Sequence, residues 1–172
     1  MKNRNGCLLM KIIKASCGTE IKVSEEWHEI LCLLKWYIHE PVCGSGRKYA
    51  ITRRMIKGKV YTCYMHRIIA DPANGMVVDH QNGDSLDNRI GNLRVCTKTE
   101  NNRNRIGLNK DTSSVFKGVH HHRGKFWTAG IYHQSRRMHL GCFKTEHEAA
   151  RAYNEAALKY HGEFARLNII ED

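Results

Sequence analysis

An acid and a histidine stand side by side at the end of a strand-like run, in the sequence VVDHQNGD. Hydrolysis of a phosphodiester needs a base that deprotonates water, and a histidine with a pKa near neutrality can provide it. It also needs positive charge near the phosphate, which a divalent cation held by Asp or Asn oxygens can supply. Asp79 and His80 therefore suggest a one-metal nuclease site, with Asp79 on the metal and His80 as the base.

Two asparagines follow at positions that suit the same site. Asn101 lies in the first turn of a predicted helix and can bring a second oxygen to the metal, although Asn102 beside it leaves a one-residue ambiguity. Asn92, on a predicted return strand, can hydrogen-bond the loop and hold the His80 ring in place. The alternative is that Asp and Asn only build turns here, as they often do. That alternative applies to Asp79, Asn82, Asp84, Asp87 and Asn88.

The elements around these residues are predicted in the order strand, loop, strand, helix. A strand at 76–79 precedes Asn82-Gly83, the type of turn that a tight hairpin needs. A return strand follows at 90–95, and a capping box of the form T-x-x-E predicts a helix from about Lys98.

The run YMHRIIA…MVVDHQNGDSLDNRIGNLRVCTKTENNRNR, over about residues 60–105, closely resembles the HNH nucleases with a ββα-metal motif, in the subgroup of phage and intron homing endonucleases. The resemblance implies His80 as the general base and Asn92 as the residue that braces the loop. It implies Asp79 and Asn101 as ligands of one divalent cation, Mg²⁺ or Mn²⁺. Many family members carry a histidine where this chain has Asn101, a change that the homing subgroup tolerates.

The residues before this motif predict a small α+β region. Residues 7–15 are expected to form a strand, and residues 25–38 show helical spacing with Ser24 as a plausible N-cap. Two alternating strands flank the Lys-Gly pair at 57–58, which indicates a hairpin.

A second module follows and contains three short strands and a helix. The strands are expected at 115–121, 125–133 and 138–143, and a capping box at Thr145 and a glycine at Gly162 bound the helix. KGV, the strand with Trp127, LGCF and AARAYNEAALKYHG resemble the sheet-plus-helix DNA-binding domain of Apetala/ethylene-response-factor transcription factors. The resemblance implies that the sheet enters the major groove and contacts bases and phosphates.

Positive charge is concentrated in one part of the chain. Residues 89–144 hold twelve Lys or Arg and only two acids, in a chain of net charge +11. A stripe of this kind favours a polyanion such as double-stranded DNA, because binding releases counterions from the phosphates. A merely soluble basic surface is the alternative. The residues expected to contact DNA are Arg94, Arg103, Arg105, Lys117, Arg123, Lys125, Trp127, Arg136 and Arg137.

Four residues carry a second interpretation or a structural one. Trp127 fits a core position equally well. His120 and His122 stand where family members often have arginine, which predicts stronger binding at lower pH; sharing one strand face, they could instead bind a transition metal. His66, in YMHR, also matches the homing subgroup, and we expect it to be structural.

The predicted fold class is α+β: a small N-terminal region, a ββα-metal nuclease module, and a three-stranded antiparallel sheet packed on one helix. The predicted boundaries are 1–58, 59–104, a linker at 105–114, and 115–170. Seven cysteines without a CxxC pair argue against a disulfide framework and a paired-thiol zinc site, and no apolar run suggests a signal peptide or a membrane span. We expect a cytoplasmic monomer, in the host cell if the gene belongs to a phage, that is a metal-dependent DNA endonuclease. The alternative is a DNA-binding regulator with an inactive nuclease fold.

Overall fold

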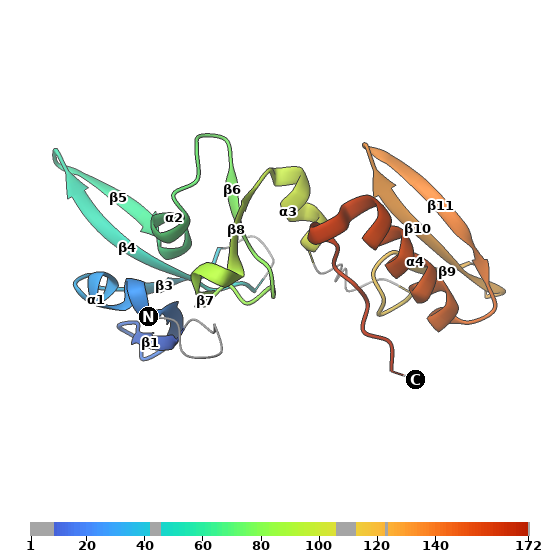
Figure 1. Cartoon of the computed structure of the whole chain (residues 1–172), viewed down its shortest axis with the longest axis horizontal. Helices are drawn as coiled ribbons and strands as arrows, with labels where there is room; N and C mark the ends of the chain where they lie inside the picture. Colours follow the sequence, from blue (N-terminus) through green and yellow to red (C-terminus); the bar gives the residue numbers. More distant parts are fainter. Residues whose placement is uncertain (1–8, 42–45, 106–112, 123, 172) are drawn as a thin grey trace. The chain divides into compact units, whose positions relative to one another are not determined.

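The computed structural model describes residues 9–41, 46–105, 113–122 and 124–171 (Figure 1). The chain divides into two compact units, Met1–Lys98 and Thr99–Asp172. Both units combine helices with small sheets, which confirms the predicted mixture of α and β structure. None of the helices in the described ranges combines the length and the apolar character that a membrane crossing requires.

The described residues of the first unit form three small sheets, with strand orders β1-β2-β7, β3-β4-β5 and β6-β8. Its elements are β1 (Met10–Lys14), β2 (Glu20–Ser24), α1 (Glu25–Cys32), β3 (Tyr37–His39), β4 (Tyr49–Ile56), β5 (Lys59–Tyr64), α2 (Met65–Ala70), β6 (Val77–His80), β7 (Asp87–Asn88), the 3-10 turn η1 (Ile90–Asn92) and β8 (Leu93–Cys96).

The core of this unit lies between α1, α2 and the strands, and Trp36 is its largest fully buried side chain. The helical pattern at 25–38 predicted too long a helix: α1 ends at Cys32, and Tyr37–His39 forms a strand instead. The Trp36 indole supports the end of α1, because its Nε1 donates a hydrogen bond to the Leu31 carbonyl at 2.8 Å.

Ser24 occupies the N-cap position of α1, as predicted, although its side chain makes no cap hydrogen bond. Its hydroxyl instead accepts a hydrogen bond from the backbone N–H of Ile90 at 2.9 Å, so it fastens the region between β6 and β8 to the N-terminal sheet.

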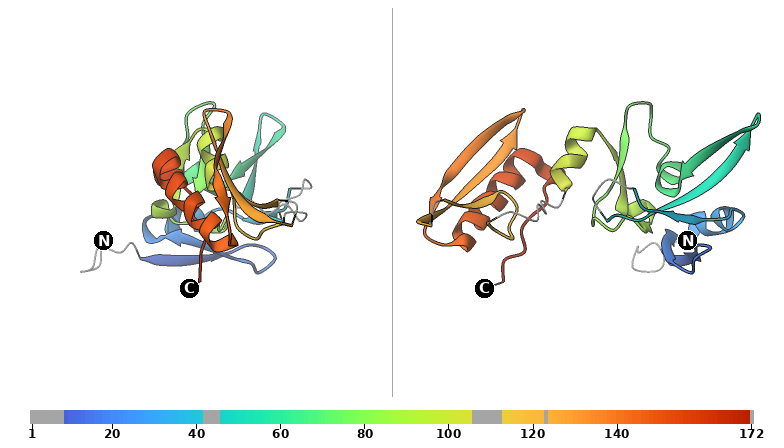
Figure 2. Two further views of the ribbon diagram at one scale, coloured as in Figure 1. Left: turned by 90° about the vertical axis from the view of Figure 1, so that its right-hand side faces the viewer. Right: turned by 180° about the vertical axis from the view of Figure 1, so that it is seen from behind.

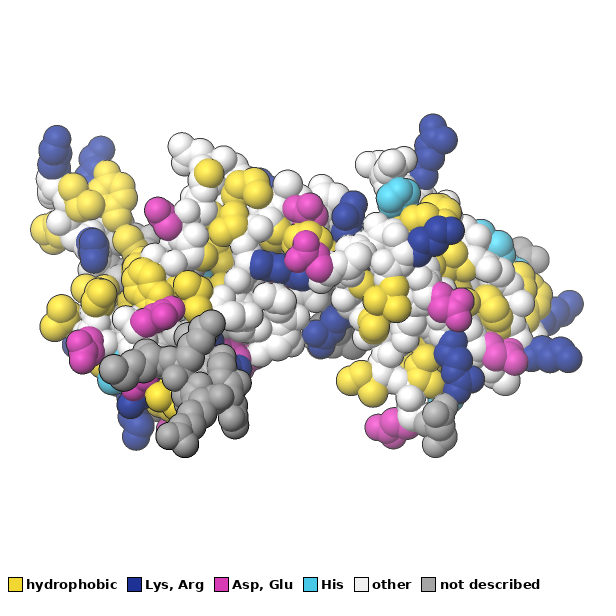
Figure 3. All heavy atoms as spheres, viewed as in Figure 1, with side chains coloured by type: hydrophobic (Ala, Val, Ile, Leu, Met, Phe, Trp, Pro, Cys, Tyr) yellow, Lys and Arg dark blue, Asp and Glu magenta, His cyan; other side chains and the backbone are white. Residues whose placement is uncertain are grey.

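The hairpin of β4 and β5 turns at Lys57 and Gly58, as predicted, and both residues have positive φ. The Lys-Gly pair therefore adopts the left-handed backbone that a two-residue hairpin turn needs. Hydrophobic side chains cover this hairpin, with Lys and Arg side chains beyond them (Figure 3). The exposed hydrophobic residues are Met55, Ile56, Val60 and Tyr61.

The strands β6 and β8 pair antiparallel, with Asp79 opposite Arg94 and His80 opposite Leu93. A long loop joins them, so the predicted tight hairpin at Asn82-Gly83 is wrong. The turn itself exists, since the Gly83 N–H donates to the His80 carbonyl at 2.9 Å. It opens a longer connection that contains β7 and η1, because β7 pairs with β2 rather than with β6.

In the second unit, α4 lies along one face of an antiparallel sheet of order β11-β10-β9 (Figure 2). The elements are α3 (Lys98–Asn104), which begins at the unit boundary, β9 (Val119–His122), β10 (Phe126–His133), β11 (Arg136–Phe143), α4 (Glu146–His161) and the 3-10 turn η2 (Gly162–Phe164). The first strand starts later, and the third earlier, than the sequence predicted.

The helix α4 can approach the sheet closely because its buried face is made mainly of alanines. These residues are Ala149, Ala150, Ala156 and Ala157, with Tyr153 among them. The capping box of Thr145 and Glu148 is formed, as predicted. Gly118, with φ +76°, lies under the Tyr153 ring, and a Cβ atom there would come within 2.2 Å of a ring carbon. Only glycine satisfies both the backbone conformation and this contact.

Candidate active site

Asp79 and His80 are the last two residues of β6, and both side chains are buried, with exposed fractions of 5% and 7%. The cross-strand neighbour of Asp79 is Arg94, whose Nε and Nη2 both donate to Asp79 Oδ2, at 2.9 and 2.7 Å. Only 11% of the Arg94 side chain is exposed. Arg94 was expected to contact DNA. In the structure its guanidinium instead forms an ion pair with the Asp79 carboxylate.

The His80 ring belongs to an aromatic cluster that three separate elements build. Tyr49 comes from β4, His66 from α2 and His80 from β6. The His66 and His80 ring centroids are 5.2 Å apart in an edge arrangement, and Tyr49 lies 5.6 Å from His66 and 6.4 Å from His80. The His80 ring therefore packs against rings from two other elements.

Both histidines of this cluster are held in the neutral form. Burial, together with the charges of His80 and Arg67, lowers the pKa of His66 to about 3. Burial also lowers the pKa of His80, while the Asn88 side chain and the Asp79 carboxylate partly oppose this. A neutral imidazole can accept a proton, so His80 can act as a base at neutral pH. The His66 ring packs against the His80 ring.

Asn88 is a site residue that sequence reasoning assigned only to a turn. It lies in β7, its side chain is almost fully buried, and it favours the protonated form of His80. Among the described residues its amide makes no hydrogen bond of standard geometry. A buried amide without a hydrogen-bond partner is unusual. The position of Asn88 beside His80, a residue that can change its charge, explains it. No local pattern in the sequence marks Asn88, because the β2–β7 pairing that buries it is long-range.

Asn92 was expected on the return strand, but it ends the 3-10 turn η1, immediately before β8. Its Nδ2 donates to the Asp87 carbonyl at 2.7 Å, and its Oδ1 accepts from the Asn82 N–H at 3.0 Å. These two bonds tie the loop after His80 to the start of β8. They are the kind of contact that a loop brace requires.

Asp87 is the centre of the same loop. Arg89 donates to both of its carboxylate oxygens, at 2.8 and 2.7 Å, and Asn82 Nδ2 donates at 2.9 Å. Burial alone would raise the pKa of Asp87, but these hydrogen bonds and the Arg89 charge lower it overall. Asn82 and Asp87 thus behave as the turn-building alternative expected, whereas Asp79 and Asn88 contact other groups.

Asn101 lies on α3, within the second unit. Asp79 and Asn101 both carry hard oxygen donors, which suit Mg²⁺ or Mn²⁺. Across the described ranges, no group of three His, Cys, Asp or Glu side chains is arranged to hold a metal ion.

The second unit places the expected DNA-binding residues in different settings. Lys125, Arg136 and Arg137 are exposed, and Arg123 lies outside the described residues. Trp127 packs against the core between the sheet and α4, which favours its core alternative, and its ring lies 4.5 Å from that of His121.

Lys117 turns inward rather than toward solvent. Its Nζ donates to the carbonyls of Arg103 and Arg105, the latter at 2.7 Å, at the C-terminal end of α3. A cation at this end of a helix is favourable, because the last carbonyls have no partner within the helix.

Comparisons with known proteins support two functional parts. Residues 63–103 match the family model for an HNH endonuclease. A protein of Acanthamoeba polyphaga mimivirus, named as an uncharacterized HNH endonuclease, is 29% identical over 154 residues, which cover 90% of this chain and 77% of that protein.

Further similarities are to plant proteins, including two that are named as transcription factors. An AP2/ERF and B3 domain-containing transcription factor of Arabidopsis thaliana is 50% identical over 75 residues, 44% of this chain and 19% of that protein. An ethylene-responsive transcription factor of Medicago truncatula is 37% identical over 90 residues, 51% of this chain and 30% of that protein. The chain thus spans less than a third of either plant protein. Together the matches support an HNH endonuclease domain and a DNA-binding domain.

Proposed function

We propose that this chain is a metal-dependent DNA endonuclease of the homing type, in which His80 is the general base. The observation that carries the proposal is the neutral, buried imidazole of His80 beside Asp79 at the end of β6. Its pKa lies below the ordinary value, so the base is available at neutral pH. The HNH match over residues 63–103 supports the same assignment.

In the proposed reaction, His80 takes a proton from water while the water oxygen forms a bond to phosphorus and the bond to the 3′-oxygen breaks. Tyr49 and His66 orient the imidazole through ring contacts. Asn88 stabilises the imidazolium that forms, since it favours the protonated ring. Asn92 keeps the following loop in place through its hydrogen bonds to Asn82 and Asp87.

Asp79 and Asn101 are the proposed ligands of one Mg²⁺ or Mn²⁺ ion. When bound, the cation would supply positive charge for the phosphoryl and leaving oxygens. The carboxylate and amide oxygens have the donor chemistry that such an ion prefers. The Arg94 guanidinium holds the Asp79 carboxylate through Oδ2, so it sets the orientation in which that group meets a cation.

The proposed partner is double-stranded DNA, bound mainly by the second unit of a monomeric, cytoplasmic protein. The exposed Lys125, Arg136 and Arg137 are its proposed phosphate or base contacts. Contacts that position the backbone are separate from the chemistry of cleavage. A nuclease part and a binding part in one chain are therefore a sensible division.

A supercoiled plasmid tests the proposal directly. Incubation with Mg²⁺ or Mn²⁺ should give relaxed or linear DNA, and excess EDTA should stop cleavage while a gel-shift assay still detects binding. Cleavage that persists in excess chelator would disprove the metal-dependent mechanism.

A DNA-binding regulator with an inactive nuclease fold is the second candidate. The ion pair of Asp79 with Arg94 favours it, because this carboxylate already has a cationic partner. The similarity to plant transcription factors points the same way. An Arg94→Gln variant separates the two candidates. If the chain is a nuclease, the metal concentration needed for plasmid cleavage should differ between Arg94→Gln and the wild type. If it is a regulator, neither the wild type nor the variant should cut the plasmid.

A further inference from the structure

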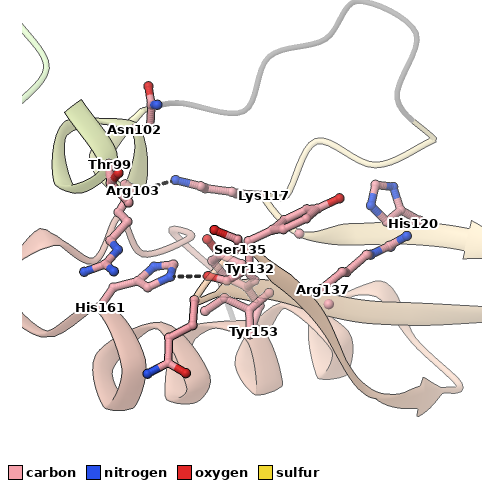
Figure 4. Close-up of a pocket in the computed structure, with 14 residues that line it drawn as sticks. Thr99, Asn102, Arg103, Lys117, His120, Tyr132, Ser135, Arg137, Tyr153 and His161 are labelled. Carbon is pink, nitrogen blue, oxygen red and sulfur yellow. Dashed lines mark hydrogen bonds between the residues drawn. The ribbon is translucent and has the colours of Figure 1, made fainter.

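A cavity of about 690 Å³ lies within the second unit, between the end of α3, the sheet and the end of α4 (Figure 4). Arg103 and His161 stand on one side of it, and Arg137 and His120 on the other. Lys117 reaches across to α3. None of the described residues that line the cavity is acidic.

The cationic groups of the cavity affect one another. Burial lowers the pKa of Lys117 to about 8, with a further contribution from the charge of Arg166. Burial also lowers the pKa of His161, and the charges of Arg103 and Lys117 add to the effect. An anion placed among these groups would oppose all of these shifts, since an opposite charge favours the charged form.

Hydrogen bonds fix the walls in position before any ligand arrives. The Asn168 side chain accepts from the Lys117 N–H at 2.7 Å and donates to the Lys117 carbonyl at 3.1 Å. His161 Nε2 donates to the Tyr132 carbonyl at 2.8 Å. Groups that are already held lose little entropy on binding.

Two of the cationic groups keep their charge available. Among the described residues, neither Arg103 nor Arg137 forms an ion pair with an acid. Guanidinium groups match the oxygens of a phosphate with paired N–H donors. The lining also includes Ile131 and Tyr132, which offer apolar surface beside the charges.

We infer that this cavity binds the phosphate group of a nucleotide. Its volume lies in the range of pockets that enclose a small ligand, and is larger than a bare phosphate needs. The charges fit the phosphate, and the apolar surface fits a sugar or base. The phosphate can belong to the DNA backbone or to a free nucleotide; only the first source rests on the proposed function.

Titrations of the full chain followed by ¹H–¹⁵N NMR test this inference. The probes are inorganic phosphate, thymidine 5′-monophosphate and a short DNA duplex, with EDTA present and ionic strength held constant with NaCl. Phosphate and the mononucleotide should shift the amide signals of Gly118, Gly130 and Ser135, which line the cavity. EDTA removes any divalent metal ion, so the titrations measure phosphate binding without cleavage. A protein that is inactive as a nuclease can therefore still give the expected shifts.

The matched variants are Arg137→Gln, at a residue that lines the cavity, and Lys144→Gln, at an exposed cation after β11 that does not line it. Arg137→Gln should weaken mononucleotide binding by about tenfold, the effect of losing one charge-assisted hydrogen bond. Lys144→Gln should leave it unchanged. A second variant, Arg103→Gln, removes a charge from the other side and should act like Arg137→Gln if the fold is intact by circular dichroism.

The outcomes are distinct. If the duplex shifts the same amides and displaces the mononucleotide, the ligand is a backbone phosphate; if it does not compete, the ligand is a free nucleotide. Amides that stay unshifted with both phosphate and mononucleotide, or equal effects of Lys144→Gln and Arg137→Gln, would overturn the inference.

Discussion

The two units of this chain differ in how they place their charged side chains. In the first unit Asp79, His80 and Asn88 are almost fully enclosed, and two arginines are paired with acids, Arg89 with Asp87 and Arg94 with Asp79. The second unit encloses mainly alanine side chains beneath its sheet, and within the part of the chain that the structure describes, Arg137 on this sheet forms no ion pair with an acid.

The difference reflects two kinds of work. Proton transfer needs a group with a defined orientation and a controlled pKa, and both come from burial and fixed neighbours. Attraction to a polyanion needs charge that water and counterions can reach, because their release drives binding. The comparison therefore predicts that changes in the first unit alter chemistry without altering affinity, and that changes in the second unit do the reverse.

The strongest test of this separation is His80→Ala. Loss of a general base should slow plasmid cleavage by about a thousandfold, while DNA affinity in a gel-shift assay stays the same. His28→Ala, at a half-exposed position of α1, is the control and should cleave normally. If His80→Ala also abolishes binding, His80 supports the fold and the comparison fails.

The second test concerns the close contact that holds α4 on its sheet. Gly118→Ala should destabilise the second unit by about 3 kcal/mol, because the added Cβ meets the Tyr153 ring and the backbone has positive φ. Gly124→Ala is the matched control, since Gly124 has φ +72° but nothing within 4 Å of a Cβ. It should cost only about 1 kcal/mol.

Thermal unfolding of both variants, followed by circular dichroism, measures this difference. Equal effects of the two substitutions would show that the tyrosine contact is unimportant. Because the contact belongs to the second unit, DNA affinity should fall with the folded fraction.

The third test removes charge from the second unit. Arg136→Ala combined with Arg137→Ala should weaken DNA binding by about thirtyfold, and should reduce the slope of log affinity against log salt by about 1.8 if each contacts one phosphate. Filter binding over a salt series measures both values. Single-turnover cleavage at saturating protein should keep its rate, and an unchanged affinity would move the interface elsewhere.

Features that depend on residues close together in the sequence were predicted better than features that depend on distant residues. The turn at Lys57-Gly58 and the capping box at Thr145 depend on residues within a few positions, and both were predicted correctly. The helix of residues 25–38 was predicted too long, because the burial of Trp36, a tertiary effect, ends it early. The Asn82-Gly83 hairpin failed because β7 pairs with the distant strand β2.

The candidate site shows the same limit. The sequence selected Asp79, His80 and Asn92 by type and spacing. It could not show that Arg94 pairs with Asp79 or that Asn88 faces His80, since both contacts depend on strand register and burial. Lys117 was expected to contact DNA. Its hydrogen bond to the Arg105 carbonyl at the end of α3 joins residues that are distant in the sequence, so no local pattern reveals it.

The smallest expected effect is a change in the free energy of unfolding with pH, because the folded first unit keeps His66 neutral. Its folded pKa is about 3, against an ordinary 6.5, so below pH 6.5 the unfolded chain binds a proton that the folded chain excludes. Stability should therefore be unaffected above pH 6.5 and should fall as the pH decreases toward 3. Between pH 7 and 5.5 this one group should remove about 1.3 kcal/mol.

His66→Leu replaces the imidazole with an apolar side chain of similar size and removes the titration. It should therefore reduce the loss of stability between pH 7 and 5.5 by about 1.3 kcal/mol. Urea unfolding of both proteins at a series of pH values measures it. A wild-type slope that His66→Leu does not reduce would mean that His66 is protonated in the folded state. His66 would then be able to exchange protons with His80, and the structural role assigned to it would be lost.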